Sequence, residues 1–436
     1  MLNVLKYTVR GYFQKLVREG EQFQRWLTTL AQLDCEGEHY RRDFQLAALR
    51  EAVMHANSIP FWRRRFAECG IDPLNVASVE DLKKLPLLTK QEVQSNLSSL
   101  VSPHAKKLLL SKGLTSGTTG SPGIYYRDLR SVNFENAMTW FIRSKTGMKP
   151  GCRLAWLRGD LVVPSSKHEP AFWVRNFAEK KLLVSTYHLV PKYKREILDA
   201  IASFHPAGAY AYPSAAYILA RWCRELDTKL PFLNLHTSSE TLLAEQRELI
   251  RSTLDGRWVD NYGQAERVNF FASLDSDDYH VHSEYGVTEL IPHSDGLYEI
   301  VGSSLHNYAM PLFRYRTGDV VRSLDESGAE RPIIRGLSGR KEDFVRLPDG
   351  RLIGRLDLVF KGLTNIVEGQ IYQVSPGSIV LRIVREDGYC ADNQLKLLRN
   401  ARDRLGHEVE LSVEYLERIP RSNDNKFRFV VSNVTH

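Results

Sequence analysis

Short apolar runs alternate with helical segments through the middle of the chain, and this alternation limits the folds open to it. The runs at 154–157, 182–185 and 208–212 have the length and composition of buried strands, and segments with helical spacing separate or follow them. Strands that alternate with helices favour an α/β architecture with largely parallel sheets. We therefore predict a large mixed α/β domain whose parallel or mixed sheets are flanked by helices.

The C-terminal hundred residues have a different pattern. They contain a helical segment at 393–404 and strand-like runs at 360–367, 379–384 and 411–415. This is the size and content of a small α+β domain. We expect a large N-terminal domain over residues 1–338 and a small, mobile C-terminal cap domain over residues 339–436, joined at a strongly charged junction.

Composition narrows the class of protein. Hydrophobic residues make up 43% and charged residues 25% of the 436 residues, as in soluble globular proteins. The net charge of +7 permits anionic ligands but does not demand nucleic acid, and we expect none as a partner. Five scattered cysteines without Cys-x-x-Cys spacing, and no signal peptide, favour a cytoplasmic protein. His280 and His282 share a strand face without a third ligand, so we interpret them as surface residues.

The stretch from Leu114 to Gly123 concentrates hydroxyls and glycines. Glycines let backbone N–H groups approach an anion closely, and threonine and serine hydroxyls add donors around a polyphosphate. The apolar run 107–110 just before it is predicted to be a strand that feeds this loop. The alternative is a solvated surface turn, since such clusters are usually loops.

Two later segments place polar turns at predicted strand ends, where α/β sheets bind ligands, and a third contains an aspartate after Thr-Gly. Ser238 and Ser239 form a small polar turn, or else a helix cap. Tyr262 offers a ring face for a base, and Glu266 offers a carboxylate for a magnesium-bound polyphosphate. Asp319, which follows Thr-Gly, has a carboxylate suited to both hydroxyls of a ribose; the alternative for each segment is a generic turn.

Both ends of the chain carry basic residues of interest. Lys426 follows a polar turn on the cap domain, from which it would reach a negatively charged transition state; otherwise it is solvated surface. Residues 1–20 have apolar side chains at helical spacing with lysine and arginine on the other faces. We favour packing of this helix on its own domain, and the alternative is peripheral contact with the inner face of an anionic membrane.

Taken together, these segments resemble the adenylate-forming superfamily of acyl- and aryl-CoA ligases and peptide adenylation domains. Four motifs occur in the family's order between about residues 110 and 430: Thr-Ser-Gly-Thr-Thr-Gly-x-Pro, Tyr-Gly-x-x-Glu, Tyr-Arg-Thr-Gly-Asp and Gly-Arg-x-x-Asp. The segments 57–62, 85–90 and 310–315 are similar to the phenylacetate–CoA ligase-like branch, which includes capsular-polysaccharide-biosynthesis members.

The resemblance implies ATP and Mg²⁺ as cofactors and a role for each matching residue. Glu266 would hold magnesium and, with Lys426 and Thr118, would be catalytic. Tyr212 and Pro213 would border the acid. The nucleotide would be bound by Thr115, Ser116, Gly117, Thr118, Thr119, Gly120, Ser238, Ser239, Glu240, Asn261, Tyr262, Gly263, Asp319 and Arg340.

The implied reaction is the attack of a carboxylate on the α-phosphorus of MgATP, which gives an acyl-adenylate and pyrophosphate. The acyl group would then pass to CoA or to another thiol or amine acceptor. The segment 345–350 departs from the family pattern that helps to build the thioester-forming conformation, so CoA stays one candidate acceptor among several. Two alternatives remain open: a phosphotransferase that makes ADP, and a catalytically silent, membrane-associated scaffold of polysaccharide assembly.

Overall fold

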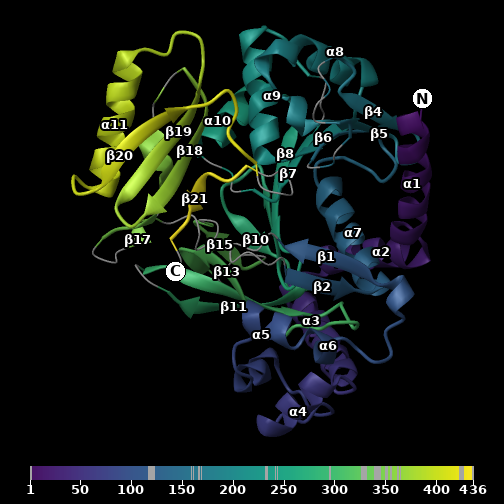
Figure 1. Ribbon diagram of the computed structural model, residues 1–436. Helices are drawn as coiled ribbons and strands as arrows, with labels where there is room; N and C mark the ends of the chain where they lie inside the picture. The colour runs from purple at the N-terminus through teal and green to yellow at the C-terminus, as the bar shows by residue number, and fades with distance from the viewer. Residues whose placement is uncertain are drawn as a thin grey trace.

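The computed structural model describes most of the chain, and all statements below concern the residues it describes. It forms a large domain and a smaller C-terminal α+β domain (Figure 1). The described residues are 2–115, 123–158, 160, 162–164, 167, 169–230, 234–240, 242, 244–293, 296–325, 331–337, 345–348, 352–353, 356–360, 363, 365–421 and 427–434.

A ten-stranded sheet forms the centre of the large domain, in the order β14-β15-β10-β9-β8-β7-β6-β3-β5-β4. The neighbours β5, β3, β6, β7 and β8 run parallel, while β4 and the strands beyond β8 pair antiparallel. This confirms the predicted mixed α/β class. The strands are β3 (Leu154–Leu157), β4 (Trp173–Asn176), β5 (Lys181–Val184), β6 (Gly208–Ala211), β7 (Asn234–Ser238), β8 (Arg257–Gly263), β9 (Phe270–Leu274), β10 (Tyr279–Val281), β14 (Ser323–Asp325) and β15 (Ile333–Arg335).

Helices cover both faces of this sheet. Trp258 and Val259 are neighbours on β8 and point to opposite faces, as strand geometry requires. Trp258 packs in the core beneath α8, α9 and α10, whereas Val259 packs with α2 and α7. These helices are α2 (Glu21–Glu36), α7 (Leu129–Ser144), α8 (Lys194–Phe204), α9 (Pro213–Glu225) and α10 (Ala244–Thr253).

The remainder of the large domain packs below the central sheet as drawn in Figure 1. A hairpin, a three-stranded antiparallel sheet and several helices share a second core that contains Trp62, Phe313 and Tyr315. The strands are β1 (Ser111–Thr115), β2 (Gly123–Arg127), β11 (Gly286–Pro292), β12 (Tyr298–Ser304) and β13 (Tyr315–Val321), and the helices are α3 (Glu38–Ala56), α4 (Pro60–Glu68), α5 (Lys90–Ser95) and α6 (Leu97–Leu100). Helix α1 (Leu2–Arg18) packs elsewhere, beside β4 and β5 of the central sheet.

The C-terminal domain has a four-stranded sheet in the order β20-β19-β18-β21, with α11 packed in its core. Arg221 of α9 reaches this domain: its guanidinium donates to the carbonyl of Ile366 at 2.6 Å and pairs with Glu386. The predicted boundary at 338/339 lies outside the described residues and stays a prediction. The elements are β16 (Val345–Arg346), β17 (Leu352–Ile353), β18 (Ile366–Ser375), β19 (Ser378–Arg385), α11 (Ala391–Leu405), β20 (Glu410–Tyr415) and β21 (Val430–Ser432).

Three sequence-based expectations were wrong. The run 107–110 is not a strand: Lys107–Leu109 is a 3₁₀ turn, and the strand begins at Ser111. The predicted strand at 360–367 is mostly not one either, because the chain forms a 3₁₀ turn at Leu356–Phe360 and β18 begins only at Ile366. His282 is buried rather than a surface residue. The carboxylate of Glu284, also buried, accepts a hydrogen bond from its ring at 3.0 Å and so satisfies it in the interior.

Candidate active site

The strands on either side of the hydroxyl-rich stretch form an antiparallel hairpin. β1 and β2 pair up to Thr115 and Gly123, so the two strand ends that border the loop lie side by side. The hairpin therefore determines where the loop begins and ends. The following predicted phosphate-binding residues lie outside the described part of the chain: Ser116, Gly117, Thr118, Thr119 and Gly120.

A chain of hydrogen bonds fastens this hairpin to the centre of the domain. The hydroxyl of Tyr125 lies 3.0 Å from that of Tyr315, which in turn donates to Oε1 of Glu266 at 3.0 Å. Burial, followed by the Glu266 carboxylate, raises the pKa of Tyr315, so this phenol stays a donor. Arg127 on the same hairpin donates through Nε to the carbonyl of Ala265 at 2.9 Å. The hairpin, the Tyr-Gly-x-x-Glu motif and β13 thus converge.

A second contact joins the same two motifs. The hydroxyl of Tyr262 donates to Oδ2 of Asp319 at 2.6 Å, and the ring of Tyr262 stacks on Phe271 with 4.9 Å between centroids. Burial, followed by the charge of Asp319, raises the pKa of Tyr262 and keeps its proton in this bond. Gly318, just before the aspartate, has φ 75°, a left-handed conformation that favours glycine.

The small polar turn after β7 faces an arginine that the sequence did not reveal. Arg158 donates to the hydroxyl of Ser238 at 2.8 Å and to that of Ser239 at 3.0 Å. Its guanidinium also lies over the rings of Tyr210 and Tyr212, at 4.4 and 4.8 Å from their centroids. Such stacking suits the planar guanidinium group. The predicted adenine-pocket serines are therefore oriented by an arginine from the end of β3.

The side chain of Asn261 is held by a hydrogen bond from a buried histidine, His236. Arg143 donates through Nε to Nδ1 of His236 at 2.9 Å, so the ring proton lies on Nε2, which donates to Oδ1 of Asn261 at 2.6 Å. Burial and then the Arg143 charge lower the pKa of His236, which keeps this imidazole neutral. The Asn261 amide is thereby fixed with its oxygen toward His236.

Glu240 links the two domains. Its Oε2 accepts the backbone N–H of Ser214 in the first turn of α9 at 3.0 Å, and its Oε1 accepts the backbone N–H of Phe427 at 2.8 Å. Burial raises the pKa of Glu240, and the backbone donors oppose that shift. The preceding Ser239 has φ 73°, a conformation that side chains rarely adopt and that turns the chain at this point. Lys426 lies outside the described residues, next to Phe427.

The two residues predicted to border the acid begin α9. Tyr212 is its N-cap and Pro213 its first residue, a position that proline favours. A small cavity lies beside them, and Arg421 of the C-terminal segment closes one side. Arg421 pairs with Glu368, lies over the ring of Phe427, and has a buried Nη1 without a partner among the described residues. The cavity is lined by Thr186, Leu189, Tyr212, Ser214, Ala215, Ile218 and Arg421.

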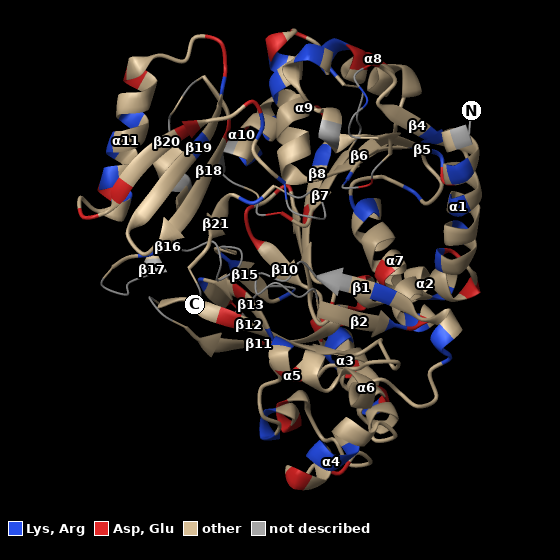
Figure 2. Ribbon diagram, in the orientation of Figure 1, with Lys and Arg blue, Asp and Glu red and all other residues tan. Residues whose placement is uncertain are grey.

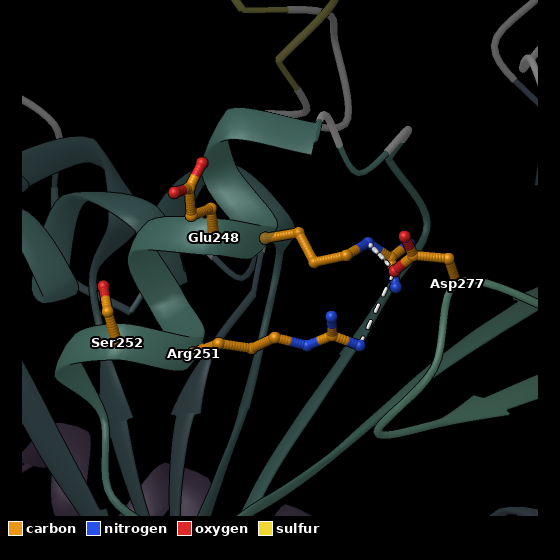
Figure 3. Close-up of a pocket in the computed structure, with 5 residues that line it drawn as sticks. Glu248, Arg251, Ser252 and Asp277 are labelled. Carbon is orange, nitrogen blue, oxygen red and sulfur yellow. Dashed lines mark ion pairs between the residues drawn. The ribbon is translucent and has the colours of Figure 1, made fainter.

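A second hollow lies on the far end of α10 and is unrelated to these residues (Figure 3). Asp277 pairs there with Arg247 at 3.2 Å and with Arg251 at 3.5 Å. The two arginines that line this hollow therefore already pair with a carboxylate of the protein, Asp277.

The described site residues fit the groups that the motifs imply. Oε1 of Glu266 accepts a hydrogen bond from Tyr315, and the carboxylate can still accept further hydrogen bonds or bind a metal ion. Magnesium typically takes one or two carboxylates together with substrate phosphates. Accordingly, the described residues contain no cluster of three or more His, Cys, Asp or Glu side chains suited to a metal. The carboxylate of Asp319, which accepts the Tyr262 hydroxyl, suits the hydroxyls of a ribose whose base lies near the Tyr262 ring. Gly263 ends β8 beside them, and Arg340 lies outside the described residues.

Comparison with known proteins gives consistent results. The family model of the CapK C-terminal domain matches residues 346–433. Protein CapK of Staphylococcus aureus is 22% identical over 82% of this chain and 81% of its own. Phenylacetate-coenzyme A ligase of Pseudomonas putida is 26% identical over 70% of this chain and 71% of its own. The crystal structure of a 2-hydroxyisobutyryl-CoA ligase bound to an acyl-AMP superposes with a TM-score of 0.66 and 17% identity, over 91% of this chain and 90% of that one.

The fold and the converging motifs are those of the adenylate-forming superfamily. Within it, the chain is similar to phenylacetate-coenzyme A ligases and to CapK, which supports the phenylacetate–CoA ligase-like branch. The resemblance seen in the sequence is thereby confirmed.

Proposed function

We propose that the protein is an AMP-forming ligase that activates a carboxylic acid as an acyl-adenylate. The hydrogen bond from Tyr262 to Asp319 carries this proposal, because it brings together two motifs that lie 57 residues apart. The Tyr125–Tyr315–Glu266 chain places the hydroxyl-rich hairpin at the same spot. Relatives named phenylacetate-coenzyme A ligase support the same chemistry.

Each part of the site has a role in this reaction. The loop from Thr115 to Gly120 would wrap the β- and γ-phosphates. Asp319 with Arg340 would hold the ribose, and the turns that contain Ser238, Ser239, Glu240, Asn261, Tyr262 and Gly263 would enclose the adenine. Glu266 would hold a magnesium ion that neutralises phosphate charge. Lys426 would bridge the acid and the α-phosphate, because positioning and charge neutralisation dominate such transfers.

The acid would enter beside Tyr212 and Pro213. After adenylation, the small domain, with its boundary near 338/339, would rotate to admit CoA or another thiol or amine. CoA is favoured by the relatives' names, and Thr118 and Lys426 would act in the first half-reaction only. A place in polysaccharide assembly rests on the sequence resemblance alone and is the more remote part of the proposal.

The decisive experiment is ATP–pyrophosphate exchange with a panel of aliphatic, hydroxy and aromatic acids, with the product nucleotide identified by chromatography. We expect AMP, and loss of exchange in Asp319→Asn but not in the exposed control Asp255→Asn. ADP as product would instead indicate a phosphotransferase. MgATP binding without turnover by any acid would indicate a catalytically silent scaffold. Parallel reactions with CoA and with hydroxylamine would separate thioester formation from adenylation.

A further inference from the structure

Helix α1 packs on the large domain through one side only, on which Tyr7 and Gly11 are buried. Gly11 lies so close to β4 that an added Cβ would come within 2.4 Å of Nδ2 of Asn176. Tyr7 is buried on the same side, and the hydroxyl of Thr8 accepts the backbone N–H of Phe177 at 3.3 Å. In Figure 1 the helix lies at the edge of the molecule beside β4. The sequence-based expectation that α1 packs on its own domain is therefore correct for this side of the helix.

The opposite side of α1 is apolar and exposed. Leu5, Phe13 and Leu16 are 61–64% exposed, far more than a helix that packs only for its own fold requires. Their spacing places them on one face with Val9 and Tyr12. Phe177, whose backbone N–H donates to Thr8 of α1, is itself 63% exposed. We call this surface the outer face of α1; it comprises Leu5, Val9, Tyr12, Phe13 and Leu16.

The charge of α1 is entirely positive. Between Leu2 and Arg18 the sequence has four basic residues and no acidic residue. Lys6, Arg10 and Lys15 are exposed and border the outer face, and Figure 2 shows basic segments along the helix. An apolar face bordered by lysine and arginine is the pattern of helices that lie in a membrane interface. No helix in the described part of the chain is long and apolar enough to span a bilayer.

We propose that the outer face of α1 binds the surface of a bilayer that contains anionic phospholipid. The charges decide against a second copy of this chain, because pairing two such faces would bring Lys6, Arg10 and Lys15 of both copies together. An anionic interface neutralises those charges while the apolar side chains enter the boundary between headgroups and acyl chains. This inference is independent of the proposed ligase activity.

Flotation with vesicles of phosphatidylcholine alone, or mixed with phosphatidylglycerol, tests the proposal. We expect the full chain to float with the mixed vesicles and only weakly with neutral ones. The variant Leu5→Gln/Phe13→Gln/Leu16→Gln should bind at least about tenfold more weakly, since apolar side chains that enter the bilayer interface supply much of the binding. The variant Lys6→Gln/Arg10→Gln/Lys15→Gln should lose about fivefold per charge and lose its dependence on salt.

The matched control changes three leucines elsewhere that are 62–96% exposed, Leu74→Gln/Leu108→Gln/Leu395→Gln, which should leave flotation unchanged. Circular dichroism melting of every variant shows whether it is folded, whatever the fate of the ligase proposal. Equal flotation of the outer-face variant and the wild type would overturn the inference, as would no flotation of the wild type. A wild-type dimer by light scattering that the outer-face variant abolishes would assign the face to self-association instead.

Discussion

Oε1 of Glu240 lies 2.8 Å from the backbone nitrogen of Phe427, and Oε2 lies 3.0 Å from that of Ser214. One half-buried carboxylate therefore joins the start of α9 to the C-terminal segment, immediately after Lys426. If Lys426 acts on the α-phosphate, Glu240 positions it by holding its neighbour.

Replacing this carboxylate should impair adenylation without unfolding the protein. Glu240→Gln sets an amide N–H₂ against one of the two backbone donors and removes a charge-assisted bond of about 1.5–3 kcal/mol. We expect ATP–pyrophosphate exchange to fall by about ten- to hundredfold. The exposed Glu248→Gln on α10 is the matched control and should behave as wild type. Unchanged exchange in Glu240→Gln would refute the positioning role.

The lysine itself is the more direct target. In Lys426→Ala we expect exchange to fall by on the order of 10²–10³, because a charge aimed at the developing transition state is lost. Binding of MgATP, followed by the shift in melting temperature, should persist. Lys229→Ala, which removes an exposed lysine paired with Asp255, serves as the control. Full retention of exchange would rule out the assigned role.

Tyr315 should act on the metal through Glu266. The phenol orients that carboxylate, and loss of such a supporting partner weakens metal binding by about 10–100-fold. Exchange in Tyr315→Phe should therefore need a higher Mg²⁺ concentration for half-maximal rate, with the rate largely restored at saturation. Glu266→Gln should not be rescued in this way. Tyr298→Phe, on an exposed ring, is the control. An unchanged Mg²⁺ dependence in Tyr315→Phe would argue against this route.

The buried histidines should make the fold sensitive to acid. Burial lowers the pKa of His306 to about 3 and that of His282 to about 4. In the unfolded chain both titrate near about 6.5. Below that pH, the unfolded state therefore binds more protons than the folded state. The free energy of unfolding is unaffected by these histidines above about pH 6.5 and falls toward pH 4, by about 1.4 kcal/mol per pH unit for each histidine.

Urea unfolding at several pH values checks this expectation. His306→Phe should show a shallower loss of stability between neutral pH and pH 4, because one of the two titrating imidazoles is removed. Phenylalanine suits this position, since Nδ1 of His306 lacks a partner among the described residues and its ring stacks on Phe134. His39→Phe, which changes an exposed histidine, should keep the wild-type slope. Identical slopes in His306→Phe and wild type would contradict the assignment.

The sequence predicted those parts of the site that depend on local order. The motifs that contain Tyr262 and Asp319 lie in β8 and β13, which belong to different sheets, and the resemblance to the family's ordered motifs was the reason to expect them together. Most helices and parallel strands followed from periodicity. Boundaries were predicted less well: the strand expected at 107–110 begins only at Ser111, and the strand expected at 360–367 begins only at Ile366.

Other residues could not be found in this way. Arg158, Arg421 and Tyr125 have no local pattern that separates them from ordinary strand-end or loop residues. Their partners lie far away in the chain: Arg158 meets Ser238, and Tyr125 meets Tyr315. Likewise, burial of His282 follows from Arg331 and Glu284 nearby, which pair at 2.8 Å, and not from its alternation with Val281.

The cavity beside Tyr212 is walled by a 3₁₀ turn, by α9 and by Arg421 of the C-terminal segment, whereas the hairpin next to Glu266 is tied down by Tyr125, Tyr315 and Arg127. Among the described residues, these two sets of side chains do not overlap. If the acid binds beside Tyr212 and the nucleotide beside Glu266, substitutions at one set of side chains would leave the other set in place. Libraries confined to the cavity wall offer a way to retarget the enzyme toward new acids while its energy-coupling half is left intact.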